Sequence, residues 1–246
     1  MYSFRSVNVL GDDIDAQAIV KKAEEQLRAN AVYSISRMEV HKPGLPPTWM
    51  DFESYVLVKG SVENSLSVYL TPALLKGTAM LMVGDDMWMR SASSGRVRKL
   101  GTMAKNKALS GSDFSYADFN MNTWSLLDNY TVSLEKASEK KAGKSCYKLR
   151  FSAIKDKEAP YTQLVVYITH GEFYFVQIDF YQKNAVIKTL EISDYKRFGD
   201  KAYPLQLVMT NCISGTSTAL TTSEVELNSS RVKDELFTVD YLEQMK

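Results

Sequence analysis

The chain has 246 residues, 30 basic against 29 acidic side chains, 45% hydrophobic residues and two cysteines. The balanced charge gives no case for a nucleic-acid or anionic-membrane binder, and apolar runs such as Ala79–Val83 are too short to span a bilayer. The length fits one large β domain or two smaller ones, either with a sizeable buried core.

An early helix is expected over residues 14–29, because the acidic residues just before it can cap its first turn. The apolar residues near helical spacing are Ile14, Ala18, Ala23 and Leu27. The chain then changes to period two over residues 32–41, 52–59 and 65–71, which predicts strands.

Residues 78–83 and 86–90 are expected to form a hairpin around Gly84-Asp85-Asp86. Alternation places Trp88 on the opposite face from its two methionine neighbours. The methionines expected to face the interior are Met80, Met82, Met87 and Met89. Met is flexible and polarizable, so these residues indicate either ordinary core filling or an apolar site that accepts variable shapes.

Residues 100–127 are too aromatic for a free linker and are expected to form short helices packed on the sheet. Phe114, Tyr116 and Phe119 are the aromatic candidates for contact with an apolar ligand there. Asp113 and Asp118 are interpreted as caps of turns or short helices rather than as a catalytic carboxylate pair.

From residue 129 onward, alternating segments separated by turn-prone residues predict an antiparallel meander with one buried face. The residues expected to line its concave side are Val176, Ile178, Phe180, Leu205, Leu207 and Met209. The whole chain, residues 1–246, is interpreted as one mainly β (α+β) domain with about ten strands. Its sheet would be strongly curved or an open barrel, with helices against the concave side.

Catalytic and metal-binding patterns are absent from the sequence. Neither His41 nor His170 has a second ligand at metal spacing, and no nucleophile elbow, phosphate loop or dinucleotide fingerprint is present. We therefore expect neither an enzyme nor a cofactor nor a bound metal. Cys146 and Cys212 indicate neither a disulfide framework nor a metal site.

A small basic cluster contains Arg96, Arg98 and Lys99. It indicates either a solvated sheet edge or a contact to an anionic head group or a carboxylate. Arg98 is expected to pair with Asp113 or Asp118 and so to hold the segment after residue 110 against the strand before it.

Four segments resemble the outer-membrane lipoprotein-sorting protein family, which is related to the periplasmic lipoprotein carrier LolA. They are LKGTAML (75–81), DMWM (86–89), RVRK (96–99) and GSDFSYAD (111–118), and the tail segments DELFT (234–238) and YLE (241–243) are similar as well. The resemblance covers roughly residues 15–245 in order.

That resemblance implies a LolA- or LppX-like open half-barrel with a helical lid and a hydrophobic cavity for acyl chains. It also implies a periplasmic location in the cell envelope after removal of a signal peptide, which this sequence does not show. The family's carrier holds its lid closed with a strand arginine, for which Arg37 is the candidate here.

The implied function is a carrier or sensor for acyl chains of a lipid or lipoprotein, with an inner-membrane transporter or an outer-membrane acceptor as partner. It involves neither nucleic acid nor a membrane span. The alternative is a non-enzymatic envelope adaptor of the same fold with a filled interior. If the protein is a carrier, we expect an apolar cavity of several hundred Å³. Ile178→Trp would then block binding of an acyl probe while the fold survives.

Overall fold

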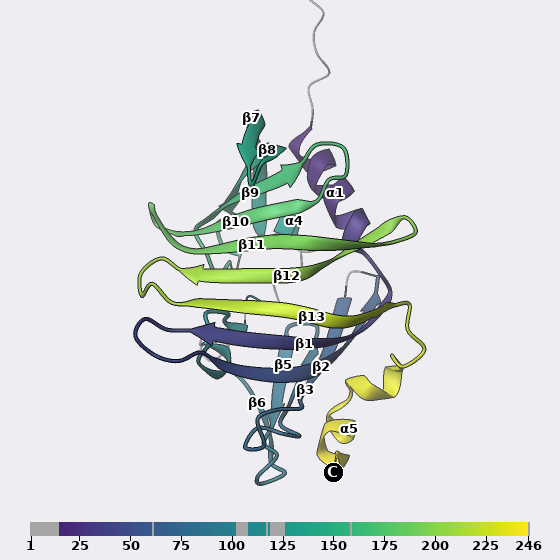
Figure 1. Ribbon diagram of the computed structural model, residues 1–246. Coiled ribbons are helices and arrows are strands. Elements are labelled where there is room, and N and C mark those ends of the chain that lie inside the picture. The colour runs from purple at the N-terminus through teal and green to yellow at the C-terminus, as the bar shows by residue number, and fades with distance from the viewer. Residues whose placement is uncertain are drawn as a thin grey trace, which may run out of the picture.

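The sheet that dominates the molecule has thirteen strands, all paired antiparallel (Figure 1). The computed structural model describes residues 15–60, 62–101, 108–116, 118, 126–157 and 159–245. The strands are β1 (Ala31–His41), β2 (Thr48–Lys59), β3 (Val62–Tyr69), β4 (Ala79–Val83), β5 (Asp86–Arg90), β6 (Val97–Lys99), β7 (Tyr130–Lys141), β8 (Lys144–Ala153), β9 (Gln163–Thr169), β10 (Phe175–Gln182), β11 (Ala185–Phe198), β12 (Lys201–Asn211) and β13 (Ser217–Leu227).

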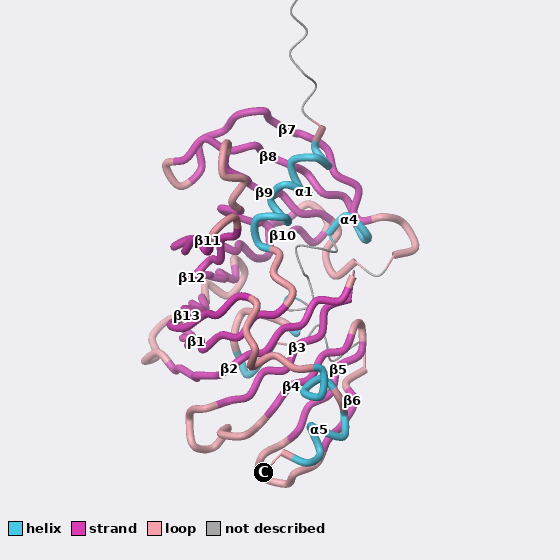
Figure 2. The backbone as a smooth tube through the Cα atoms, turned by 90° about the vertical axis from the view of Figure 1, so that its right-hand side faces the viewer, coloured by secondary structure: helices cyan, strands magenta, loops and turns pink. Residues whose placement is uncertain are grey.

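Two meanders make up this sheet, and they meet where β1 pairs with β13. The strand order is β6-β5-β4-β3-β2-β1-β13-β12-β11-β10-β9-β8-β7, so β6 and β7 are the two edges and the barrel stays open. Figure 2 shows the sheet curving around α1 (Ala16–Leu27). The predicted fold class, a curved antiparallel half-barrel, is confirmed.

Three strands, β6, β7 and β13, make up the difference between the thirteen observed strands and the expected ten. β6 has only three residues. β7 is largely exposed beyond its first few residues, and β13 is rich in Ser and Thr. Hydrophobic alternation is therefore weak in these strands, and the backbone pairing of their neighbours decides their structure.

α1 lies within the predicted range, and the Asp15 carboxylate accepts a hydrogen bond from the Gln17 backbone N–H at 3.0 Å. Its buried stripe consists of Ala16, Ile19, Val20 and Ala23. Ala18, expected on that stripe, is exposed, and Ile14 lies outside the described residues. The helix contacts β7 and β12, and so bridges part of the open side of the half-barrel.

The hydrophobic core is divided between the two faces of the sheet. The main cluster fills the concave side and runs from α1 to Phe180 and Leu220. An outer cluster forms where the 3-10 helix η3 (Asp234–Phe237) and α5 (Val239–Gln244) pack on the convex face of β3–β6. The apolar C-terminal segment thus docks on the sheet.

The middle of the chain contributes short helices, as expected, within the part that is described. They are η1 (Leu109–Gly111) and α4 (Leu126–Asn129). Cys146 is buried and Cys212 exposed, and neither forms a disulfide. None of the described helices is long and apolar enough to cross a membrane.

Candidate functional site

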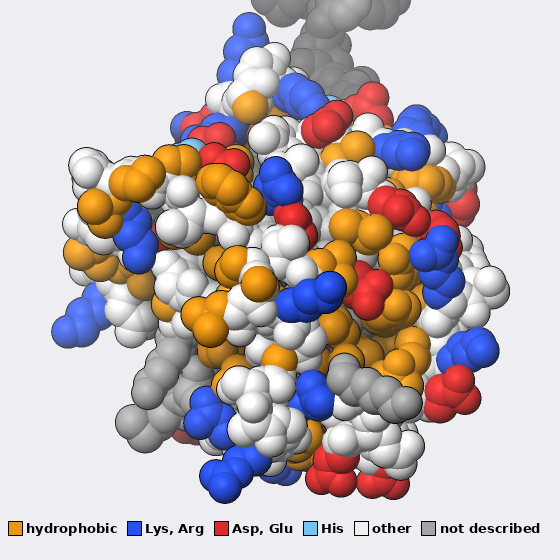
Figure 3. Space-filling model, turned by 60° about the horizontal axis from the view of Figure 1, so that its bottom comes forward, with side chains coloured by type: hydrophobic (Ala, Val, Ile, Leu, Met, Phe, Trp, Pro, Cys, Tyr) orange, Lys and Arg blue, Asp and Glu red, His pale blue; other side chains and the backbone are white. Residues whose placement is uncertain are grey.

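A cavity of about 310 Å³ lies on the concave side, between the inner faces of β1–β3, the last turn of α1 and strands β12 and β13. Figure 3 shows hydrophobic side chains gathered around a hollow on the lower face of the molecule. The apolar residues that line the cavity are Leu27, Ala29, Val32, Phe52, Val56, Val58, Met80, Met82, Pro204, Leu207 and Leu220.

The cavity exists because small side chains occupy neighbouring inward positions of three adjacent strands. Ser34 of β1 pairs in register with Ser54 of β2, which pairs with Ser67 of β3. Ser36 and Ser65 flank this row and also line the cavity. Protein interiors are otherwise close-packed, so five hydroxymethyl side chains in one patch leave space that larger residues would fill.

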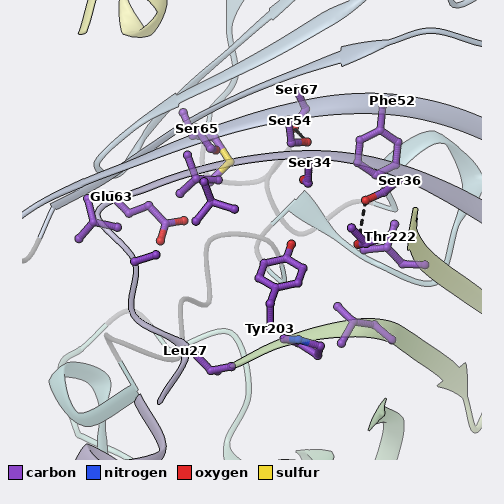
Figure 4. A pocket seen from close by; sticks show the side chains of 18 of the residues that line it. Leu27, Ser34, Ser36, Phe52, Ser54, Glu63, Ser65, Ser67, Tyr203 and Thr222 are labelled. Atoms are coloured by element: carbon purple, nitrogen blue, oxygen red, sulfur yellow. Dashed lines mark hydrogen bonds between the residues drawn. The ribbon is translucent and has the colours of Figure 1, made fainter. Parts of the chain in front are cut away.

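Four of the hydroxyl groups that line the cavity satisfy one another in pairs. The Ser36 and Thr222 hydroxyl oxygens lie 3.0 Å apart, and those of Ser54 and Ser67 lie 2.8 Å apart (Figure 4). These hydrogen bonds allow polar side chains to line an otherwise apolar cavity without the cost of unpaired buried groups.

Tyr203 projects from β12 into the cavity, with its hydroxyl directed toward the serine row (Figure 4). Burial raises the pKa of Tyr203, the hydroxyls of Ser34 and Thr222 lower that pKa, and Glu63 raises it. The net direction is upward, so the side chain is a neutral phenol at ordinary pH. Glu63 reaches toward the same space from the start of β3 (Figure 4).

Of the expected methionines, Met80 and Met82 line the cavity. Met87 is fully buried in the main cluster, and the Tyr116 hydroxyl lies 3.9 Å from the Met89 sulfur. Trp88 contacts the outer cluster on the opposite face. The predicted split of this hairpin across the two faces is confirmed.

Most of the other predicted lining residues are packed rather than open to the cavity. The main cluster contains four of them, each at most 5% exposed: Phe114, Ile178, Phe180 and Met209. Of the residues predicted in β10 and β12, Leu207 lines the cavity. Leu205 lies neither in the cavity wall nor in the described clusters. Phe119 lies outside the described residues.

The side chain of Val176 does not point to the concave face, although the expected alternation in β10 requires it. The register with β9 shifts between Phe175 and Gln177, which is a β-bulge, and a bulge changes the side to which the following side chains point. Phe175 and Ile178 therefore share the concave face, while Val176 packs on the other face with Cys146 and Val165. The expectation that Ile178→Trp would fill a void is wrong, because Ile178 is packed in the core.

Asp113 is buried and the Asp118 side chain is only 3% exposed, and among the described contacts neither carboxylate pairs with Arg98. The Asp113 carboxylate accepts hydrogen bonds from the hydroxyls of Thr216 and Thr218 at the start of β13, the latter at 2.7 Å. Asp118 accepts a hydrogen bond from the Ser115 backbone N–H at 2.6 Å, as the cap interpretation predicts. Its cationic partner is Lys188 of β11, at 2.9 Å.

The expected Arg98 pairing is therefore wrong. Arg98 is exposed. Burial raises the pKa of Tyr116, and the charge of Arg98 opposes this rise only in part. Arg96 is also exposed. Lys99 forms an ion pair with Asp86 at 2.8 Å, so this cluster fits the solvated edge better than a head-group site.

Among the described residues, the partner of Arg37 is Asp51 of β2 and not a helix of the expected lid. The Arg37 guanidinium donates two hydrogen bonds to the Asp51 carboxylate, at 2.7 and 3.0 Å, on the face opposite to buried Met38. The hydrogen bond from Arg37 lowers the pKa of Asp51, and burial opposes this shift. The pair fixes neighbouring positions of β1 and β2 from outside.

Neither the serine row nor Tyr203 is among the predicted lining residues, because that prediction rests on large apolar side chains. The available signal was the recurrence of serine at alternate positions of three consecutive predicted strands. Such residues leave space only when the strands are in register, and that register comes from the pairing of the sheet.

A second hollow, of about 350 Å³, lies at the turn between β9 and β10 and is lined by polar residues such as Lys144 and Glu172. His170 in this turn makes a 2.9 Å hydrogen bond with the Ala137 carbonyl oxygen, a structural role. Within the described ranges, His, Cys, Asp and Glu side chains form no group of three or more that could hold a metal ion.

No curated protein matches this chain in sequence, and a family model described only as that of an uncharacterized protein matches residues 61–244. Three solved structures share the fold. An outer membrane lipoprotein-sorting protein domain from Vibrio parahaemolyticus is 23% identical, with a TM-score of 0.83, over 94% of this chain and 100% of that one. A DUF1329 family protein from Desulfovibrio piger is 24% identical, with a TM-score of 0.83, over 92% and 98% of the two chains. A LolA superfamily protein from Nitrosomonas europaea is 22% identical, with a TM-score of 0.75, over 93% and 99%.

Proposed function

The chain belongs to the uncharacterized protein family whose model matches residues 61–244, and it shares the fold of LolA-superfamily and lipoprotein-sorting structures. From these premises and the cavity we propose that it is a periplasmic carrier or sensor that binds an acyl chain of a lipid or lipoprotein. The ligand would lie between β1–β3 and β12.

The observation that carries this proposal is the cavity itself. A volume of about 310 Å³ lies at the lower end of the range typical of ligand sites. An adaptor with a filled interior would have no reason to keep such a space in a close-packed protein. Burial of an alkyl chain there would supply roughly 25 cal/mol per Å² of apolar surface before the costs of association.

The size of the cavity suits one chain rather than several. An apolar cavity of about 150 Å³ admits one benzene molecule, so 310 Å³ accommodates on the order of a dozen carbon atoms. The methionines at the inner wall are flexible and can adapt to chains of different length.

A direct test uses a neutral pyrene-labelled monoacylglycerol and the variant Ser54→Trp. Ser54 faces the cavity, so an indole at this position occupies the space of the chain. We expect wild type to bind the probe and Ser54→Trp to weaken binding by about tenfold or more, which corresponds to at least about 1.4 kcal/mol.

Ser133→Trp, on the exposed side of β7, is the matched control and should bind like wild type. Circular dichroism of each variant establishes that the fold survives. If wild type binds no probe and native mass spectrometry finds no retained lipid, the carrier proposal is wrong and the adaptor alternative is favoured.

A further inference from the structure

Most of the exposed large hydrophobic side chains gather at one end of the sheet. In the described part of the chain six such residues are exposed, and four of them lie in or directly beside three turns at this end. We call these four the apolar rim: Leu45 (63% exposed), Trp49 (54%), Leu74 (86%) and Ile213 (78%). The other two, Val62 and Tyr241, belong to β3 and α5.

Strand pairing brings the three turns together. His41, at the end of β1, pairs with Ser217 at the start of β13, so the β1–β2 and β12–β13 turns are neighbours (Figure 1). The Asp51 carbonyl oxygen accepts hydrogen bonds from the backbone N–H groups of Leu70 and Thr71, at 2.7 and 3.2 Å. The β3–β4 turn therefore begins beside the start of β2, and all three turns project from the same end of the sheet.

Each turn holds its hydrophobic residue in a fixed backbone. The Lys76 N–H donates a 3.0 Å hydrogen bond to the Pro72 carbonyl oxygen and closes the turn that carries Leu74. The Ile213 N–H donates a 3.0 Å hydrogen bond to the side-chain oxygen of Asn211. Turn tips ordinarily carry Gly, Asn, Asp or Ser. Large aliphatic side chains at several neighbouring tips are atypical, and such a group of exposed apolar residues marks an interaction surface.

The charge of the three turns is positive, although the whole chain is nearly balanced. Residues 42–47, 70–78 and 212–216 include Lys42 and Lys76, both exposed, and no acidic residue. The next turn along the sheet, between β10 and β11, adds the exposed Lys183.

The acidic groups on the adjoining strands and behind the turns are already paired. Asp51 lies 2.7 Å from the Arg37 guanidinium, and Glu39 lies 2.9 Å from His41. Asp113, behind the β12–β13 turn, is buried and accepts hydrogen bonds from threonine hydroxyls. The exposed lysines therefore give this end of the sheet a charge that complements an anionic surface.

The residue types favour a lipid surface over a protein surface. Protein interfaces are enriched in aromatic residues and Arg and depleted of Lys, and Leu is under-represented among their energetically important residues. The apolar rim consists of three aliphatic residues and one Trp, with lysines beside them. Aliphatic side chains enter the acyl boundary of a bilayer, Trp prefers its interface, and Lys is attracted to anionic head groups.

We propose that the apolar rim docks the protein on the surface of an anionic phospholipid bilayer. Leu45, Leu74 and Ile213 enter the acyl boundary, Trp49 lies at the level of the head groups, and the lysines of the turns contact lipid phosphates. This inference goes beyond the proposed function and does not depend on it, because none of the four rim residues lines the cavity.

The experiment measures co-sedimentation of the full chain with vesicles of phosphatidylcholine and phosphatidylglycerol in equal parts. We expect wild type to bind these vesicles and to bind less as the salt concentration rises. Leu74→Ser/Ile213→Ser should weaken binding by about tenfold or more, because two apolar contacts with the acyl boundary are lost. Vesicles should also shift the tryptophan emission of wild type to shorter wavelength, and Trp49→Phe should reduce this shift.

Two further variants test the place of the surface and the role of charge. Val62→Ser removes an exposed aliphatic side chain after the β2–β3 turn, at the opposite end of the strands, and should bind like wild type. Lys42→Gln/Lys76→Gln should weaken binding to the anionic vesicles about tenfold and leave binding to pure phosphatidylcholine vesicles unchanged. All the substituted residues are exposed, so the variants should fold, which circular dichroism checks.

The outcomes that overturn this proposal differ from those that concern the cavity. Absence of vesicle binding by wild type overturns it, as does equal binding by wild type and Leu74→Ser/Ile213→Ser, or an equal loss in Val62→Ser. Wild type that ignores vesicles but forms oligomers, which Leu74→Ser/Ile213→Ser dissociates, would assign the rim to a protein contact instead. Ser54→Trp should bind vesicles like wild type, so loss of acyl-probe binding leaves the docking proposal standing.

Discussion

At the scale of single residues, Asp118 is the most tightly held charge next to the cavity. Its carboxylate accepts hydrogen bonds from the Tyr161 hydroxyl at 2.5 Å and the Lys188 ammonium at 2.9 Å. Burial and the Asp118 carboxylate raise the pKa of Tyr161. The network connects residue 118 with β11 and with the residues just before β9, and so fixes that end of the middle segment against the sheet.

Lys188→Met should therefore be strongly destabilising. The substitution leaves a buried carboxylate without its cation, which costs about 3 kcal/mol in comparable buried pairs. Urea denaturation measures the loss in the free energy of unfolding. The double variant Asp118→Asn/Lys188→Met should recover part of it, and Arg37→Met, which removes an exposed partner, should cost much less. Equal losses for Lys188→Met and Arg37→Met would contradict this account.

Glu24 on α1 is a second carboxyl group whose protonation is shifted by its surroundings. Burial, and then the Asp128 carboxylate, raise the pKa of Glu24 from 4.5 to about 7, while Lys21 and Arg28 oppose that rise and Glu25 adds to it slightly. One of the Glu24 carboxyl oxygens is buried and has no hydrogen-bond partner among the described residues. The ionised form is therefore disfavoured where α1 faces α4.

The pH dependence of stability follows from this shift. The folded state binds the Glu24 proton more tightly than the unfolded state, so the stabilisation is complete below about pH 4.5 and is lost as the pH rises through about 7. Because the side chain is partly exposed, solvent screening reduces the effect to about 1 kcal/mol. We expect Glu24→Gln to flatten the fall in unfolding free energy between pH 5 and pH 8. Glu25→Gln, an exposed neighbour on the same helix, should leave that fall in place.

At the scale of elements, the C-terminal segment formed by η3 and α5 covers the convex face of β3–β6. Leu242 is fully buried, and Leu236 and Phe237 pack with it against Leu66 and Leu81. The Arg90 guanidinium donates a 2.5 Å hydrogen bond to the Met245 carbonyl oxygen and so holds the end of the segment in place.

Leu242→Ala should lower the free energy of unfolding by about 3 kcal/mol, the usual cost of a large buried side chain reduced to alanine. Binding of the pyrene-labelled monoacylglycerol should be unaffected in the folded variant, because the segment lies on the face opposite to the cavity. Denaturation and probe titration of the same preparation test both statements. Loss of binding without loss of stability would show that the two faces are coupled.

The elements that could be predicted from the sequence are those whose local pattern agrees with their environment. The hairpin of β4 and β5 was predicted correctly because Met82 and Met87 alternate with Leu81 and Trp88 around a Gly-Asp turn. The faces of β10 could not be predicted correctly, because the bulge at Val176 depends on the pairing of β10 with β9. A sequence pattern of period two cannot reveal where the register between two strands shifts.

The cavity was the least predictable feature for a related reason. The sequence predicts Ile178, Phe180 and Met209 as lining residues, yet such large apolar side chains fill space and are buried together. The space lies where Ser34, Ser54 and Ser67 come into register. Serine in a strand is ordinarily a solvated residue, so its inward direction here depends on the curvature and pairing of the whole sheet.

At the scale of the whole molecule, one continuous sheet joins the two meanders, and we predict that they unfold together. The β1–β13 pairing is reinforced by the Ser36–Thr222 hydroxyl pair, and the main cluster includes residues of both meanders. The sheet order runs without interruption from β6 to β7, and the single domain expected over residues 1–246 stays a prediction that unfolding experiments test.

Calorimetry of the full chain should therefore show one transition, with equal calorimetric and van't Hoff enthalpies. Bound 1-monolauroylglycerol should raise the midpoint of that entire transition, because a ligand that binds only the folded state stabilises every element that unfolds with it. Ser54→Trp should abolish the shift, and Ser133→Trp should preserve it. Two resolved transitions, of which the ligand moves only one, would mean that the meanders are separate units and that the cavity belongs to one of them.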